Sequence, residues 1–264
     1  MLDWARRDFQ QLLIAKDLAY GAGPAHRCDV YGAAHTTDAP ILVFFHGGGW
    51  TSGCKEYAAF MAPHVVSAGC VLVTPGYRLA PEHPLPAAFD DGVELLKALT
   101  TLLPAGAGNA RRVILAGHSA GGHLAALLAL RPNLLRRAGV DPDRILGCMP
   151  VSGIFNLHHP CPEPGSLEER AYDLVLENNV DDARMSPLFW VRDNTVPFAL
   201  MYGEHDSERV ILSNLRMADL LALQSAPSSC AVEPNADHFQ THTVLNNPAH
   251  PWYARLTALT RAGR

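Results

Sequence analysis

The chain has 264 residues, 48% of them hydrophobic and 18% charged, which is an ordinary balance for a folded globular protein. Its formal net charge of −5 and its scattered lysines and arginines give no basic patch of the kind that binds nucleic acid or a membrane surface. Apolar runs such as Leu124–Leu130 are far shorter than the roughly 20 residues of a membrane-spanning helix. The charged N-terminus lacks the apolar core of a signal peptide, so the default expectation is a cytoplasmic protein.

Short apolar runs alternate with longer helix-like stretches along most of the chain. The expected strands are Ile41–Phe45, Cys70–Thr74, Arg111–Ala116, Ile145–Val151, Phe198–Tyr202 and Cys230–Glu233. The expected helices are Lys55–Ser67, Ala87–Thr101, Ala120–Leu130, Glu208–Gln224 and Pro251–Ala262. This alternation is typical of a doubly wound, mostly parallel α/β sheet, in which ligands bind beyond the carboxyl ends of the strands.

Two segments fit this pattern poorly. Residues 1–25 are expected to form a helix and a loop over the sheet edge. Residues 152–195 are rich in proline, asparagine and charge, and we expect a cap-like insertion that helps to cover the site. Neither segment is long enough to predict a separate domain, so the expectation is one domain over residues 1–264.

The cysteines and histidines do not predict a metal or cofactor. Six cysteines include no C-x-x-C pair, and Cys70 and Cys148, which lie inside apolar strand-like runs, are expected to be buried free thiols. His238 and His242 have H-x-x-x-H spacing but lack the glutamate of H-E-x-x-H, and we place them in a loop or at a helix start. His242 and His250 are expected at the surface.

A candidate nucleophile lies in Gly117-His-Ser-Ala-Gly121, which follows an expected strand and opens an expected helix. This is the context that the G-x-S-x-G motif requires, with the serine on a sharp turn between small residues. We expect Ser119 to be the nucleophile and the amide of Ala120 to be one oxyanion donor at the helix N-terminus. The alternative is a tight turn with an idle serine.

A glycine cluster, His46-Gly-Gly-Gly-Trp50, follows the first expected strand. Glycines allow the backbone to turn its N–H groups inward, so the amides of Gly48 and Gly49 are expected to complete the oxyanion hole. The alternative, a phosphate-binding loop, lacks the Lys-Ser/Thr of a P-loop and the spacing of a dinucleotide fingerprint. His46 is expected to be a structural hydrogen-bonding residue.

The acid and the base are sought after Ser119, because in this motif's fold they follow in the order Asp/Glu, then His. Asp206 comes just after the strand-like Phe198–Tyr202 and is the leading acid, with Glu204 as the fallback. His238 lies in a loop before the last expected helix and is the candidate base. Its neighbour Asp237 is interpreted as a loop carboxylate.

Substrate contacts are harder to predict. Trp50 and Phe239 flank the candidate catalytic elements and are the best aromatic candidates, although such residues often belong to the core. Ser152, at the end of an expected strand, is a candidate polar contact in the pocket.

These motifs resemble two related protein groups. His46-Gly-Gly-Gly-Trp50, Tyr77-Arg-Leu-Ala-Pro-Glu-His-Pro84 and Ser119-Ala-Gly-Gly122 resemble the hormone-sensitive-lipase group of esterases. A second set, from about residue 40 to the C-terminus, resembles kynurenine formamidase (arylformamidase). It comprises His46-Gly-Gly-x-Trp50, Ser52-Gly-x-Lys55, Ala59-Phe-Met61, Gly117-His-Ser-Ala-Gly121, His123-Leu-Ala-Ala126, Val151-Ser-Gly153, Ser186-Pro187, Asp206-Ser207 and Asp237-His-Phe239.

The second resemblance implies an α/β-hydrolase fold and a cytosolic amidase that converts N-formyl-kynurenine to kynurenine and formate. It also implies a triad of Ser119, Asp206 and His238, position by position. Gly49, where formamidases often carry a bulkier residue, and the esterase-like Tyr77–Pro84 depart from it and leave the substrate open.

Three functional hypotheses follow: an arylformamidase, a broad short-chain carboxylesterase, and a catalytically silent binding protein on the same fold. The expected partner is a small acyl amide or ester. The sequence leaves the oligomeric state open, and a homodimer is one possibility.

Overall fold

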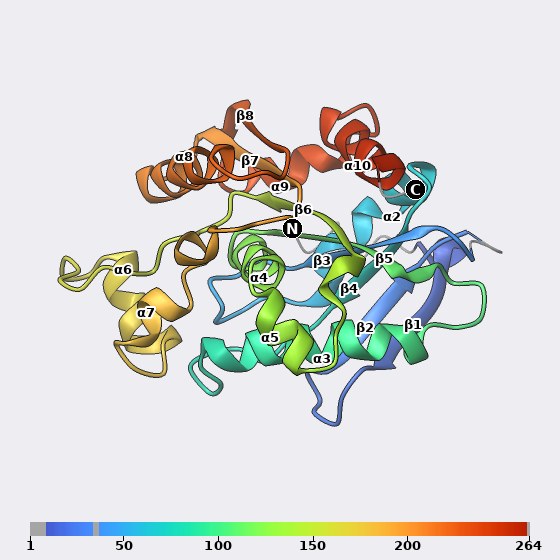
Figure 1. Cartoon of the computed structure of the whole chain (residues 1–264), viewed down its shortest axis with the longest axis horizontal. Coiled ribbons are helices and arrows are strands. Elements are labelled where there is room, and N and C mark those ends of the chain that lie inside the picture. The colour runs from blue at the N-terminus through green and yellow to red at the C-terminus, as the bar shows by residue number, and fades with distance from the viewer. Residues whose placement is uncertain (1–8, 34–36, 263–264) are drawn as a thin grey trace.

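The computed structural model describes residues 9–33 and 37–262, and its centre is an eight-stranded sheet (Figure 1). The strands lie in the order β1-β2-β4-β3-β5-β6-β7-β8, and they pair in parallel from β4 to β8. Their bounds are β1 Leu13–Ala19, β2 Arg27–Tyr31, β3 Pro40–Phe45, β4 Val71–Pro75, β5 Asn109–His118, β6 Ile145–Val151, β7 Phe198–His205 and β8 Ser228–Asp237. All six predicted strands are therefore confirmed, as is the mostly parallel α/β sheet.

Helices connect these strands. The α-helices are α2 Ala62–Ser67, α3 Leu85–Leu102, α4 Ala120–Ala129, α5 Pro132–Arg137, α6 Leu167–Arg170, α7 Asp181–Arg184, α8 Glu208–Ala222, α9 Gln240–Thr243 and α10 Pro251–Ala262. The short turns are η1 Gln10–Leu12, η2 Lys55–Met61, η3 Pro142–Arg144, η4 Ala171–Val175, η5 Pro187–Trp190 and η6 Val244–Asn246. The predicted helix Lys55–Ser67 is divided into η2 and α2. Pro63 lies in the first turn of α2, where a backbone N–H has no partner within the helix, so proline is tolerated.

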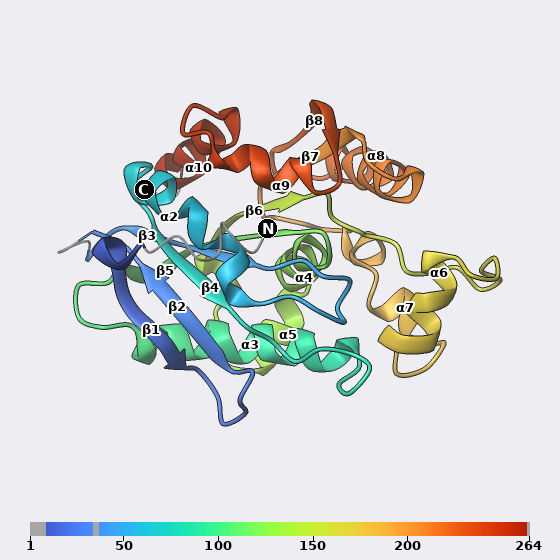
Figure 2. The same ribbon diagram turned by 180° about the vertical axis from the view of Figure 1, so that it is seen from behind.

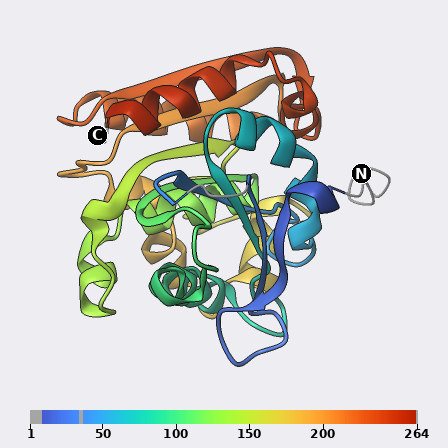
Figure 3. The ribbon, with the colours of Figure 1, turned by 90° about the vertical axis from the view of Figure 1, so that its right-hand side faces the viewer.

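The core forms one layer on each face of the sheet. In β3, Ile41, Val43 and Phe45 pack in the layer that contains α3, α4 and α8. Leu42 and Phe44 point the other way, into the layer that contains α2 and α10. Figure 3 shows α10 on the far side of the sheet from α3. Because side chains alternate along a strand, a sheet that is covered on both faces needs strands that are apolar throughout.

The N-terminal segment differs from the prediction of a helix and a loop within residues 1–25. Residues 1–8 lie outside the described part, but Leu13–Ala19 is a strand, β1, which pairs antiparallel with β2. The pairing has register shifts, and Lys16 and Asp17 are both exposed, so the strand lacks the strict alternation that would have revealed it. Its partner β2 was not predicted either.

The insertion, residues 152–195, carries α6, η4, α7 and η5. Figures 1 and 2 show α6 and α7 set apart from the helices that cover the sheet, beyond one end of the central strands. Within residues 9–33 and 37–262, no helix is long and apolar enough to cross a membrane.

Candidate active site

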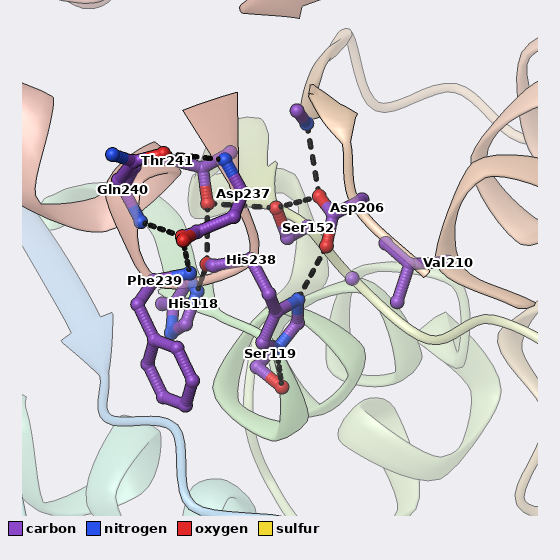
Figure 4. A network of polar contacts seen from close by, with 12 residues as sticks. His118, Ser119, Ser152, Asp206, Val210, Asp237, His238, Phe239, Gln240 and Thr241 are labelled. Atoms are coloured by element: carbon purple, nitrogen blue, oxygen red, sulfur yellow. Dashed lines mark hydrogen bonds and ion pairs between the residues drawn. The ribbon is translucent and has the colours of Figure 1, made fainter. Parts of the chain in front are cut away.

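Three side chains from distant parts of the chain form a hydrogen-bonded series (Figure 4). Ser119 lies on the turn between β5 and α4, Asp206 follows β7, and His238 follows β8. The Oγ atom of Ser119 is 2.8 Å from Nε2 of His238, and Nδ1 of His238 is 2.6 Å from Oδ1 of Asp206. The three residues that the sequence selected are thus in direct contact.

The turn at Ser119 has the strained backbone that the motif predicts. Ser119 has φ of 55° and ψ of −118°, and it precedes the first residue of α4. A Cβ atom at Gly121 would collide with the carbonyl oxygens of Phe45 and His46, so only glycine lets α4 start this close to the end of β3. The close packing holds the serine hydroxyl at the carboxyl edge of the sheet.

Asp206 is held ionised by its hydrogen bonds. Its Oδ2 accepts from the Ser152 hydroxyl at 2.6 Å and from the Gly203 amide at 2.9 Å. Burial alone would raise the pKa of Asp206, but the bonds from His238, Ser152 and Gly203 outweigh it and lower that pKa. An ionised carboxylate on Nδ1 fixes that nitrogen as the donor, so Nε2 is left to accept the Ser119 proton.

Ser152 does not line the cavity, contrary to the prediction that it contacts substrate. Its side chain is fully buried, and its hydroxyl lies 2.6 Å from Asp206 and 2.8 Å from the Thr241 hydroxyl. The reason is local: the Ser152 amide still donates to the carbonyl of Met201 on β7, and its φ of 47° is left-handed. The side chain is therefore directed toward the end of β7, where Asp206 lies.

The glycine loop after β3 is a tight turn with unused amides. Gly48 has φ of 129°, and a Cβ atom there would collide with the Ser52 carbonyl. In the described part of the chain, the amides of Gly48 and Gly49 donate to no backbone acceptor. The amide of Ala120 belongs to the first turn of α4, whose N–H groups have no intrahelical partner. These three amides are available to hold an oxyanion beside Ser119.

Trp50 links the glycine loop to the insertion. Its indole N–H donates to Nδ1 of His123 at 3.3 Å, and Nε2 of His123 donates to the carbonyl of Met185 at 2.6 Å. Burial lowers the pKa of His123 to about 4, so the ring is neutral and can both accept and donate. Trp50 thereby lies both in the core and on the cavity wall.

Two other histidines lie near the triad. His46 stacks on Tyr77 with ring centroids 4.2 Å apart and bonds its neighbour's carbonyl, which confirms its predicted structural role. Sequence reasoning missed His118, whose Nε2 donates to the carbonyl of His238 at 2.7 Å. The position of His118 inside the nucleophile motif was the one feature of the sequence that pointed to a role near the triad.

The expectation that His242 and His250 are surface residues is wrong, since they are only 3% and 7% exposed. His242 stacks on His118 and Phe44 at the end of β3, and His250 bonds Glu233. The loop after β8 folds back onto the sheet. This is a long-range contact, and local sequence patterns do not predict it.

The two rejected carboxylates have structural partners instead of His238. Asp237 accepts the amides of Phe239 and Gln240 at 2.9 and 2.8 Å, so it shapes the loop, as predicted. Glu204 accepts the amide of Asn235. Asp206 is thus the carboxylate on the histidine.

A cavity of about 560 Å³ opens above Ser119. Its walls come from the glycine loop, Ser119 and His238, the insertion, the start of α8 and the segment after β8. The lining residues are Gly47, Gly48, Gly49, Trp50, Thr51, Ser52, Tyr57, His118, Ser119, Ile154, Leu167, Arg170, Ala171, Val175, Ser207, Arg209, Val210, His238, Phe239 and His242. Two of the predicted aromatic contacts, Trp50 and Phe239, are among them. In the part of the chain that the structure describes, no cluster of histidine, cysteine or acidic side chains could hold a metal ion.

A serine on a strand–helix turn, bonded to a histidine and an aspartate that follow later strands of a parallel sheet, is the arrangement that defines the α/β hydrolases. A sequence profile of the alpha/beta hydrolase fold matches residues 42–241. The chain belongs to this family.

Among curated proteins, the chain is similar to carboxylesterase NlhH of Mycobacterium tuberculosis, with 38% identity over 172 residues, 63% of this chain and 51% of that protein. It is also similar to kynurenine formamidase of Danio rerio, with 32% identity over 142 residues, 53% of this chain and 46% of that protein. The chain therefore spans about half the length of these relatives.

Solved structures show the same fold. An esterase of Pyrobaculum calidifontis superimposes with a TM-score of 0.77 at 21% identity, covering 99% of this chain and 88% of that one. A putative thioesterase of Silicibacter sp. also has a TM-score of 0.77, at 22% identity, covering 96% and 90%.

Proposed function

We propose that the chain is a serine hydrolase that transfers the acyl group of a small amide or ester first to Ser119 and then to water. The observation that carries this proposal is the continuous contact of Asp206, His238 and Ser119 at 2.6 and 2.8 Å. His238 takes the proton of Ser119 as the hydroxyl attacks the acyl carbon. The resulting oxyanion is held by the amides of Gly48, Gly49 and Ala120.

Collapse of the tetrahedral intermediate needs an acid, and the protonated His238 supplies its proton to the leaving group. Water then attacks the acyl-enzyme with His238 as the base. An anilide nitrogen is a poorer leaving group than a phenolate, so an amide substrate depends more strongly on this proton.

Within this class, we propose N-formyl-kynurenine as the substrate, which would place the chain in tryptophan catabolism, in the cytoplasm. The motifs that resemble kynurenine formamidase extend to Asp237-His-Phe239, and the Danio rerio kynurenine formamidase is 32% identical. The second candidate, a short-chain carboxylesterase, is favoured by the higher identity, 38%, to carboxylesterase NlhH.

The test compares hydrolysis of N-formyl-kynurenine, p-nitrophenyl acetate and p-nitrophenyl butyrate by the wild type and by Ser119→Ala. It tests both the serine-hydrolase mechanism and the choice of substrate. We expect the highest kcat/KM for the formamide, and a loss in kcat on the order of 10⁶-fold in Ser119→Ala. Ser229→Ala, at an exposed serine on β8, is the matched control and should behave like the wild type.

Rapid ester cleavage without formamide cleavage would exclude the arylformamidase and leave the carboxylesterase. If none of the three substrates is turned over in a way that depends on Ser119, the serine-hydrolase proposal itself is wrong.

A further inference from the structure

The fixed charge on the wall of the catalytic cavity is positive. Among the lining residues that the structure describes, the charged side chains are Arg170 and Arg209, and there is no aspartate or glutamate. Burial lowers the pKa of His118 and His242 in the same wall far below neutrality, so neither ring carries charge there. A cationic cavity is unexpected in a chain whose net charge is −5.

Arg209 has hydrogen-bonding capacity that the protein does not use. It belongs to the first turn of α8, and its side chain is only 11% exposed. Its Nε and Nη2 atoms are buried without a hydrogen-bond partner among the described residues, although Glu168 Oε1 lies 3.2 Å from Nε. A buried donor without an acceptor costs free energy. An acceptor that arrives with a ligand would remove that cost.

The ion pair with Glu168 does not account for the whole guanidinium. Glu168 lies on α6 of the insertion, so the pair ties the insertion to α8 through Nε. Nη2 still lacks a partner, and a guanidinium presents five N–H donors in a planar fork that suits two carboxylate oxygens.

The position of Arg209 fits a ligand above Ser119. Ser207, Arg209 and Val210 bring the N-terminus of α8 to the cavity wall, and Ser207 does not cap that helix through its side chain. A free helix N-terminus adds partial positive charge to the same wall. Figure 4 shows Val210 on the α8 side of the His238 ring and Phe239 on the other side. The two walls are therefore chemically different, one cationic and one aromatic.

We propose that Arg209 is a specificity-determining residue, which makes the cavity selective for small acyl amides and esters that carry a carboxylate. This inference rests on the proposed hydrolase function and narrows its substrate class. N-formyl-kynurenine belongs to that class, because its amino-acid end carries a carboxylate, whereas simple p-nitrophenyl alkanoates do not belong to it.

Two matched substrate pairs test the proposal, with the carboxylate on either side of the scissile bond. Mono(4-nitrophenyl) glutarate is compared with 4-nitrophenyl valerate, and 4-acetoxyphenylacetate with 4-methylphenyl acetate. The measured quantity is the ratio of kcat/KM for the anionic substrate to kcat/KM for its neutral partner. We expect this ratio to exceed one in the wild type for at least one pair. Arg209→Gln should lower that ratio about 10- to 100-fold, as expected for loss of a hydrogen bond to a charged group.

Two further variants separate recognition from other effects of the mutation. Arg216→Gln makes the same charge change at an exposed position of α8 and should leave the ratio unchanged. Glu168→Gln removes the negative charge of the tether but keeps the guanidinium, so the ratio should hold or rise. If Glu168→Gln and Arg209→Gln instead slow both members of each pair equally, Arg209 is only a tether and the proposal is overturned. A ratio that Arg209→Gln does not change also overturns it.

A binding measurement makes this test independent of turnover. Calorimetric titration of Ser119→Ala with phenylacetate and with phenylacetamide compares an anion with its neutral analogue. The inference predicts tighter binding of phenylacetate, and Arg209→Gln in the same background should remove the difference. Equal affinities would overturn it. Preferential phenylacetate binding without hydrolysis of any substrate would instead contradict the hydrolase function alone.

Discussion

At the scale of single residues, the triad is supported by a second row of hydrogen bonds. Ser152 donates to Asp206, while the Thr241 hydroxyl lies 2.8 Å from both the Ser152 hydroxyl and the carbonyl of His238. Thr241 has one proton to donate, and His118 also donates to that carbonyl. The His118 ring and these two hydroxyls thus position the loop of His238.

Replacing Ser152 tests this support. Ser152→Ala removes a donor that lowers the pKa of Asp206, so that pKa should rise and the acidic limb of the pH–rate profile should move to higher pH. We expect kcat to fall about 10-fold, the value of roughly one hydrogen bond to a charged group. The measurement is kcat/KM from pH 4 to pH 9.

Ser152→Gly is the informative companion, because glycine tolerates the φ of 47° but also lacks the hydroxyl. The same loss in both variants assigns the effect to the hydroxyl. An unchanged pH profile in Ser152→Ala would contradict the role of this serine.

At the scale of elements, a partly buried ionic cluster joins the N-terminal strands to the segment after the glycine loop. The Nζ atom of Lys55 in η2 lies 2.6 Å from Asp29 of β2, 3.0 Å from Asp17 of β1 and 2.8 Å from Glu56. The Asp29 side chain is almost fully buried. Lys55 therefore couples the edge of the sheet to the segment that follows the glycine loop.

Lys55→Met should destabilise the protein by about 3–5 kcal/mol, because it leaves the Asp29 charge buried without its partner. Chemical denaturation gives the free energy of unfolding. The double variant Lys55→Met with Asp29→Asn should recover part of the loss, since the orphaned charge is then removed. Lys16→Met, at an exposed position of β1, is the control and should change stability little. A single variant as stable as the control would show that the cluster contributes nothing.

At the scale of the whole molecule, buried neutral histidines make stability depend on pH. Burial lowers the pKa of His46, His123 and His242 to about 4 in the folded state. In the unfolded chain these groups titrate near pH 6.5, so below that pH the unfolded state binds protons that the folded state does not. The contribution of these histidines to the free energy of unfolding is therefore fully present above about pH 6.5. It is lost as the pH falls toward 4, by about 1.4 kcal/mol per pH unit for each histidine.

His242→Phe isolates one of these contributions. The ring lies among Phe44, Phe60 and His118. In the described part of the chain its Nε2 atom is buried without a partner, so an apolar ring suits the site. The free energy of unfolding, measured between pH 7.5 and pH 5, should fall less steeply than in the wild type. His83→Gln, at an exposed histidine, should keep the wild-type slope. If His242→Phe also keeps that slope, His242 is not buried in its neutral form.

The amino-acid sequence alone determined the features that depend on local pattern. The strands from β3 to β7 were predictable because a sheet covered on both faces requires continuous apolar runs. The contact of Ser119, Asp206 and His238 was predictable because the nucleophile turn has a strict motif and its partners follow later strands in a set order.

Only the tertiary structure decided the features that depend on which distant residues meet. β1 is a strand because β2 pairs with it, and Ser152 supports Asp206 because its left-handed backbone turns the hydroxyl toward β7. His242 is buried because the loop after β8 folds back onto Phe44. The positive charge of the cavity arises where α8 and the insertion converge on one wall. Burial and electrostatic environment are properties of that convergence, and no single segment of sequence contains them.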